Sequence, residues 1–147
     1  CTFISSTYWT ERIGPAAALA TIRKHQRYRV GEHLIAIGRL VQAGWKAAAE
    51  PANLSVAVGG IPPLSHFAIA GPEGQAAHTL FTQLMLERGF LAGKAFYATF
   101  AHTEEQVKQY LAVAREVFPI LAQELARGTV DSRLKGPVAH SGFTRLT

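Results

Sequence analysis

The sequence predicts an α+β fold, in which a small, mostly antiparallel sheet is covered by helices and preceded by a linking helix. Two observations favour it. Apolar residues recur at helical spacing on both sides of a short central region, where they alternate at strand spacing instead. The segments of strand period also follow one another too closely for the long crossovers that join parallel strands. Neighbouring strands should therefore run antiparallel.

Two helices are predicted ahead of the strands. A hydroxyl-rich, extended segment leads into the first helix, which should begin near Glu11 and end in the basic stretch 23–29. Pro15 is tolerated if it lies in the first helical turn. The second helix fits Val30 to about Glu50, and Pro51 ends it.

The central region predicts a hairpin with a wide loop and then a third helix. Residues 54–58 and 66–70 alternate apolar and small or polar side chains, which is typical of strands. The third helix spans 75–88 and ends at Gly89. Two further short strands are expected at 90–92 and 96–98, around the bend at Gly93 and Lys94.

The last helix should run over 104–127. Thr103 and Gln106 have the spacing of a capping box, and Gly128 is a typical helix end. Pro119 lies inside the apolar stripe and should kink the helix. Residues 129–147 show no clear period and are predicted to form an extended tail.

These elements predict three parts. Residues 1–29 form a leading segment and linking helix, 30–128 form the main domain, and 129–147 form the tail. The predicted core consists of apolar residues on the inward faces of the helices and strands: Leu34, Val56, Phe67, Ile69, Leu80, Leu84, Leu111, Phe118 and Leu121.

Composition narrows the class of protein. With 147 residues, 48% of them apolar, the chain can form one domain with a substantial core. Its single cysteine, Cys1, excludes an internal disulfide, and the spacing of the six histidines predicts no metal site. No apolar run reaches the length of about 18 residues that spans a membrane, and no signal peptide is evident. We therefore expect a soluble, cytoplasmic protein, and the lack of an initiating Met leads us to expect a longer parent chain.

The residues themselves indicate no stand-alone active site. The chain lacks the nucleophile elbow Gly-x-Ser-x-Gly, the dinucleotide motif Gly-x-Gly-x-x-Gly and a phosphate-binding P-loop. The hydroxyl-rich run 5–10 just before a helix has two interpretations. It is either an ordinary helix cap or a seat for a phosphate group.

The net charge of +5 permits an anionic partner. Basic residues crowd the end of the first helix at Arg23, Lys24, Arg27 and Arg29. One interpretation is a solvated helix end, and the alternative is a basic anion- or nucleic-acid-binding module. Tyr28 is the sole aromatic residue within the cluster, so binding of nucleic acid is not expected.

Two blocks of sequence carry a resemblance to a known family. The block 5–22, SSTYWTERIGPAAALATI, resembles the segment after the catalytic lysine in class III pyridoxal-phosphate-dependent aminotransferases. The block 100–107, FAHTEEQV, resembles the start of the last helix in the glutamate-1-semialdehyde 2,1-aminomutase branch. The run 89–92, GFLA, is similar to the strand that precedes that helix. The resemblance covers about residues 3–128.

The resemblance implies a fragment, namely the C-terminal small domain of a fold type I enzyme with its linking helix. The cofactor, pyridoxal 5'-phosphate, would be held mainly by a large domain that supplies the Schiff-base lysine and the aspartate for the pyridine nitrogen. No lysine of this chain lies in a Schiff-base context. The isolated chain is therefore expected to hold no catalytic residue, to bind no cofactor alone and to be inactive.

The resemblance also implies roles for three residues. Thr7 would bind the cofactor phosphate of the neighbouring subunit in a homodimer, with Ser6 as a second candidate. Lys94 would meet an anionic group of a small amino donor or acceptor, or it is a solvated turn lysine. The chain departs from the family in having Glu11-Arg12 where an Asn-Pro pair is common. It also has no arginine in 96–100 to hold a substrate carboxylate.

Overall fold

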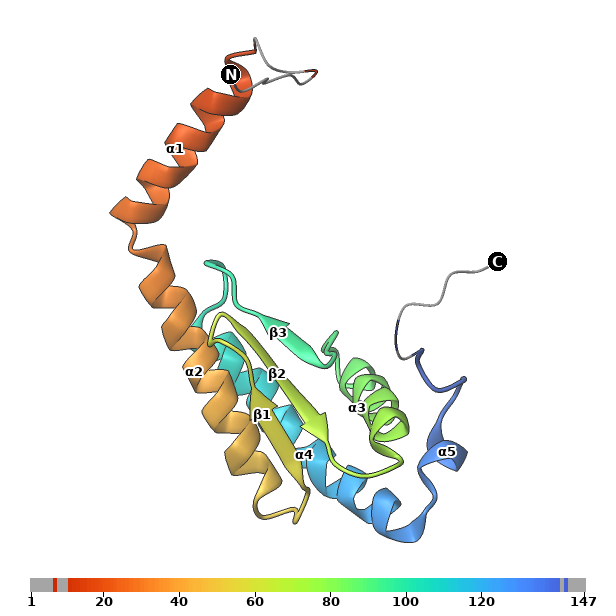
Figure 1. Cartoon of the computed structure of the whole chain (residues 1–147). Coiled ribbons are helices and arrows are strands. Elements are labelled where there is room, and N and C mark those ends of the chain that lie inside the picture. Colours follow the sequence, from red (N-terminus) through yellow and green to blue (C-terminus); the bar gives the residue numbers. More distant parts are fainter. Residues whose placement is uncertain (1–6, 8–10, 141, 143–147) are drawn as a thin grey trace. The chain divides into compact units, whose positions relative to one another are not determined.

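The computed structural model describes residue 7, residues 11–140 and residue 142. The chain divides into two compact units, Cys1–His33 and Leu34–Thr147, and each is described by itself. Figure 1 labels the helices and strands within them.

The first unit contains the linking helix that the sequence predicts. Helix α1 spans Ile13–Arg27, which places Pro15 in its first turn. Its last turn holds Lys24, His25 and Arg27, where positive charge suits the helix dipole. All residues of α1 are exposed. Arg29, with a positive φ of 49°, lies between α1 and the next helix.

The second unit contains a sheet whose three described strands are all antiparallel. Strands β1 (Val56–Gly59), β2 (Leu64–Ile69) and β3 (Ala95–Tyr97) lie in the order β1-β2-β3. Along β2 exposed and buried residues alternate, so one face of the sheet is covered. The predicted hairpin of the first two strands is confirmed, with bounds that differ by one or two residues.

Three helices that the sequence predicts cover that face: α2 (Val30–Ala49), α3 (Gly74–Glu87) and α4 (Glu104–Arg127). The short helix α5 (Val130–Arg133) packs against α3 and α4. In Figure 1 α4 runs behind the strands of the sheet. The predicted α+β class, with a small antiparallel sheet under helices, is confirmed. None of the helices in the described residues is long and apolar enough to cross a membrane.

Phe67 on β2 is the centre of the core. Its ring lies 4.9 Å from that of Trp45 on α2, 5.1 Å from Phe81 on α3 and 5.6 Å from Phe118 on α4. These four side chains are almost completely buried. Contacts between tilted and edge-on aromatic rings thus join the sheet to three helices.

Two glycines of α2 permit close packing. A Cβ on Gly38 would lie 1.7 Å from the carbonyl oxygen of Pro62 in the β1–β2 loop. A Cβ on Gly44 would lie 2.3 Å from a methyl carbon of Leu111 on α4. Any larger residue would push α2 away from these neighbours.

Seven of the nine predicted core residues are buried: Phe67, Ile69, Leu80, Leu84, Leu111, Phe118 and Leu121. The prediction was wrong for Leu34 and Val56, which are half-buried. Leu34 precedes Ile37, the first buried residue of α2. Val56 packs against the core but lies on the edge strand β1, so one of its sides stays open.

The predicted strand at 90–92 is absent. The Phe90 amide instead donates to the Met85 carbonyl at 2.9 Å, a bond that closes the end of α3. Leu91, the central residue of the predicted strand, is 90% exposed. Helix-end hydrogen bonding thus replaces strand pairing at this position.

The last helix begins and ends as predicted. The Thr103 amide donates to Gln106 Oε1 at 2.9 Å and the Gln106 amide donates to Thr103 Oγ1 at 3.2 Å, which completes the capping box. Gly128 ends α4 with φ 65°. Pro119 lies inside the continuous helix and faces solvent, where water can satisfy the carbonyl that loses its donor. The segment after Gly128 is not wholly extended, because it opens with α5.

Candidate functional site

An apolar groove is the principal candidate site in the second unit. It has a volume of about 460 Å³ and lies between the segment 90–97 and the first turns of α4. That volume is within the usual range for small-molecule sites, roughly 300–1,000 Å³. The large apolar and aromatic side chains that line it are Phe90, Leu91, Phe96, Tyr97, Val107 and Tyr110. His102 and Gln106 add polar groups, and no Lys, Arg, Asp or Glu is among the lining residues.

Tyr110 connects the groove to the core. The Trp45 indole nitrogen donates a hydrogen bond to the Tyr110 hydroxyl at 2.8 Å. The Tyr110 ring also lies 6.0 Å from Phe90 and 6.0 Å from Phe96. Burial raises the pKa of Tyr110 to about 12, and the bond from Trp45 opposes this only in part. Tyr110 therefore stays protonated at neutral pH.

His102 is held at the start of α4. Its Nδ1 accepts a hydrogen bond from the Thr99 amide at 2.9 Å, which places the proton of the neutral ring on Nε2. The ring lies 4.9 Å from that of Phe96. Gln106 is fixed by the capping box, since its Oε1 accepts from the Thr103 amide. The block 100–107, singled out in the sequence, thus forms one wall of the groove.

Lys94 lies beside the groove but is not among its lining residues. Its neighbours Gly93 and Ala95 line the groove, whereas the Lys94 amine donates to Gln75 Oε1 on α3. The Lys94 carbonyl accepts from the Phe67 amide at 3.2 Å, which extends the pairing with β2. The role of Lys94 in substrate binding stays a prediction.

His78 on α3 is a buried histidine outside the groove. Its Nε2 accepts the Ile69 amide at 3.2 Å. Burial, and next the positive charge of Lys94, lower the pKa of His78 to about 4, so the ring is neutral at pH 7. In the described residues its Nδ1 has no hydrogen-bond partner.

The predicted phosphate ligands belong to the first unit. Thr7 lies in a turn ahead of α1 and is exposed, so its hydroxyl is accessible. Ser6 lies outside the described residues. Both roles stay predictions.

A second, basic groove lies within the first unit at the end of α1. It has a volume of about 370 Å³ and is lined by Ala20, Arg23, Lys24, Arg27 and Tyr28. The Arg27 guanidinium lies over the Tyr28 ring, 5.6 Å from its centre. Arg29 forms an ion pair with Glu32 instead. Across the described residues, no three His, Cys, Asp or Glu side chains come together as metal ligands.

Comparison with known proteins shows that the chain has a fold similar to part of a solved structure. No protein-family model matches the chain, and no curated protein sequence matches it. The solved structure of the FumI protein of Sphingopyxis sp. MTA144, in its PLP internal aldimine form, matches with a TM-score of 0.72 and 21% identity. The match covers 85% of this chain and 31% of the FumI chain. The chain therefore has the fold of about a third of a PLP-containing protein.

The sequence block 100–107 contributes one wall of the groove, but sequence reasoning missed the groove itself. Its opposite wall is the irregular segment 90–94, which was predicted in part as a strand. The apolar pattern of the last helix predicts burial of Tyr110 but not its place in the groove. Its spacing from the start of α4, seven residues after Thr103, is the signal that could have placed it in this groove.

Proposed function

We propose that the chain is the C-terminal part of a PLP-dependent enzyme of the class III aminotransferase type, close to the aminomutase branch. The observation that supports this most is the match to the FumI structure, which holds PLP as an internal aldimine and of which this chain spans 31%. The two sequence blocks 5–22 and 100–107 support the narrower assignment. Fold alone does not define a reaction, so the test must detect the cofactor.

The lysines of the chain favour a Schiff base formed elsewhere in the enzyme. All five lysines lie in the described part of the chain, and all are exposed. A Schiff-base lysine usually has its pKa lowered by burial or by a neighbouring cation. Three of the amines instead contact polar side chains: Lys94 contacts Gln75, Lys108 contacts Glu104 and Lys135 contacts Glu87. The isolated chain is accordingly proposed to be inactive.

The role proposed for Thr7 is to bind phosphate across a homodimer interface. Its exposed hydroxyl fits such a role, because a phosphate oxygen accepts a hydrogen bond readily. Ser6 is the second candidate. When bound in the complete enzyme, PLP supplies an electron sink for chemistry at the amino carbon. Thr7 would only anchor it. A cytoplasmic location remains a prediction from the sequence.

The apolar groove is proposed to receive the uncharged part of the substrate. Its lining carries aromatic rings and no Lys, Arg, Asp or Glu, so it favours apolar groups over carboxylates. Tyr110 and His102, which are both among its lining residues, would orient a polar atom of the substrate. Lys94 would provide a positive charge for an anionic group at the rim only if its amine left Gln75.

The experiment that tests the function is to clone the parent reading frame and express the full-length protein. We expect a protein with a visible aldimine absorbance that borohydride removes. Peptide mapping should locate the reduced adduct on a lysine upstream of residue 1. The chain 1–147, treated in the same way with PLP, is the control and should give no adduct. A full-length protein without bound PLP would contradict the proposal.

A basic anion-binding module is the second candidate, and the groove at the end of α1 favours it. Arg23, Lys24 and Arg27 line that groove together. If it binds polyanions, the chain should be retained on heparin, and retention should weaken steeply with salt. Replacing these three residues by Gln should abolish retention, whereas Lys46→Gln should not change it.

A further inference from the structure

The C-terminal segment 133–140 is bound along α3 by a ridge of polar side chains. Gln75, Thr79 and Gln83 are spaced four residues apart, so they lie on one face of the helix. All three contact main-chain groups of the segment. We call residues 133–140 the strap.

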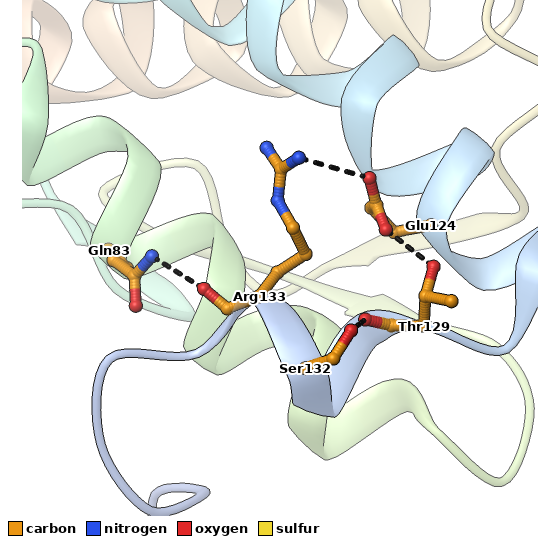
Figure 2. A network of polar contacts seen from close by, with 5 residues as sticks. All are labelled: Gln83, Glu124, Thr129, Ser132 and Arg133. Carbon is orange, nitrogen blue, oxygen red and sulfur yellow. Dashed lines mark hydrogen bonds and ion pairs between the residues drawn. The ribbon is translucent and has the colours of Figure 1, made fainter.

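Gln83 holds the near end of the strap with both groups of its carboxamide. Its Nε2 donates to the Arg133 carbonyl at 3.1 Å, as Figure 2 shows, and its Oε1 accepts from the Lys135 amide at 2.8 Å. This arrangement resembles one rung of a β-ladder, with a side chain in place of the neighbouring strand.

The near end has further anchors. Glu124 on α4 accepts from the Thr129 hydroxyl at 2.5 Å and lies 3.5 Å from the Arg133 guanidinium (Figure 2). Val130 in α5 is completely buried. The start of the strap is therefore tied to the core and is the more stable end.

The far end is held at the surface by Thr79 and Gln75. Thr79 Oγ1 donates to the Gln75 carbonyl at 2.9 Å, which leaves its lone pairs to accept the Ala139 amide at 3.1 Å. Gln75 Nε2 donates to the Ala139 carbonyl at 2.7 Å. The hydrogen bonds at both ends are exposed, but only the near end also has the buried Val130 and the Glu124 contacts, so the far end should open more easily.

Gln75 links the strap to the turn beside the groove. While its Nε2 binds the strap, its Oε1 accepts from the Lys94 amine. The Lys94 carbonyl in turn accepts from Phe67, and the adjacent residues Gly93 and Ala95 line the groove. A continuous set of hydrogen bonds thus runs from Ala139 through Gln75 to the rim.

We propose that the strap positions the Lys94 turn through Gln75, so that docking of the strap and occupation of the apolar groove are coupled. Gln75 is a positioning residue in this arrangement. The coupling is reciprocal: a ligand in the groove should also hold the strap on α3. The proposal rests on the proposed function only in taking the groove as the substrate site.

The test uses Ala139→Pro in the chain 1–147, studied by NMR. Proline at position 139 has no backbone N–H to donate to Thr79, while the chain keeps its full length. We expect several-fold faster hydrogen exchange at the Phe67 amide and altered shifts at Gly93 and Lys94. The pKa of His78 should rise from about 4, because the Lys94 charge moves away from it. Thr79→Val, which also removes the acceptor, should act in the same direction.

The matched control is Lys135→Met. It removes the ion pair between Lys135 and Glu87, 2.8 Å long, but leaves the main-chain contacts of the strap intact. We expect Phe67 exchange and the titration of His78 to remain as in the unmodified chain. The fluorescence of Trp45 would verify that each variant is folded.

Benzyl alcohol, an uncharged aromatic probe, tests the link to the groove. It should shift the amide signals of Tyr97 and Gln106, bind several-fold more weakly to Ala139→Pro, and slow exchange at Ala139 in the unmodified chain. The proposal would be overturned if folded Ala139→Pro had the same exchange rate at the Phe67 amide, the same His78 pKa and the same affinity for the probe as the unmodified chain. These measurements need no cofactor, so failure of the PLP assignment would leave their outcome unaffected.

Discussion

The Trp45 indole donates to the Tyr110 hydroxyl at 2.8 Å, and this bond joins the aromatic core to the floor of the groove. Trp45 is fully buried, whereas Tyr110 keeps a small exposed area. Since both residues lie on helices, α2 and α4, the bond fixes the floor relative to two rigid elements. The groove therefore depends on the core for its shape.

Tyr110→Phe should lower the free energy of unfolding by about 1–3 kcal/mol, because the buried Trp45 donor loses its acceptor. Urea denaturation measures this. Tyr97→Phe, at a residue that is 68% exposed on the same groove, is the control and should change stability by less than about 0.5 kcal/mol. Equal stabilities of Tyr110→Phe and the unmodified chain would contradict a structural role for the bond.

Local patterns predict much of this fold, for identifiable reasons. The alternation of apolar with small or polar residues predicts β2 correctly, because Phe67 and Ile69 are indeed buried under the helices. The predicted ends of α4 are confirmed. The capping box of Thr103 and Gln106 and the helix end at Gly128 involve only residues that are close together in the sequence. Local signals failed at 90–92, where an apolar run that looks like a strand instead closes α3 through the Phe90 amide.

The strap and the groove could not be predicted in the same way. Gln75, Thr79 and Gln83 bind main-chain atoms, which every residue has, so the sequence of the strap carries little trace of its partner. The groove combines an irregular segment with the start of α4. Such a site depends on how segments that are far apart in the sequence pack together. The spacing of residues within one segment does not predict that packing.

Gly38→Ala should destabilise the chain strongly, by about 1–3 kcal/mol or more, as overpacking of a close contact does. The added Cβ would lie 1.7 Å from the Pro62 carbonyl oxygen, which is main chain and cannot rotate away. Thermal unfolding followed by circular dichroism measures the effect.

Gly14→Ala is the matched control, since nothing lies within 4 Å of the Cβ it would add on α1. That change should alter stability by less than about 0.5 kcal/mol, because the added methyl group meets no neighbour. If both variants unfolded at the same temperature, α2 could not lie against the β1–β2 loop as described.

His78 should make stability depend on pH. The pKa of His78 is about 4 in the folded chain, against 6.5 for an ordinary histidine, mainly because the ring is buried. The unfolded chain therefore binds this proton more readily. The contribution to stability is fully present above about pH 6.5 and is lost as the pH falls toward 4, by on the order of 2–3 kcal/mol.

The control for this prediction is His78→Gln, whose amide oxygen can still accept the Ile69 amide but which does not titrate. Urea denaturation at pH 7.5 and pH 4.5 compares the two chains. The other titrating groups are common to both, so they cancel in the difference. A loss of stability as large in the variant as in the unmodified chain would show that His78 is not its source.

In the full-length PLP enzyme that we propose, Thr7→Val should weaken retention of PLP. Valine keeps the β-branched shape but lacks the hydroxyl that is proposed to donate to the cofactor phosphate. A hydrogen bond to a charged group contributes roughly 1.5–3 kcal/mol. Since 1.4 kcal/mol is about tenfold in affinity, the dissociation constant should rise by roughly ten- to a hundredfold. Thr7→Ser keeps the hydroxyl and should lose much less.

If the enzyme is a homodimer as proposed, a mixed dimer decides whether Thr7 acts on the neighbouring subunit. One chain carries Thr7→Val with an intact Schiff-base lysine, and its partner has Thr7 but lacks that lysine. If Thr7 acts across the interface, the one lysine-bearing site receives the partner's intact threonine and should retain PLP normally. If Thr7 acts within its own chain, that site should be as weak as in the Thr7→Val homodimer. If the homodimers of Thr7→Val and of the unmodified enzyme retain PLP equally well, Thr7 has no phosphate role and serves only the turn that leads into α1.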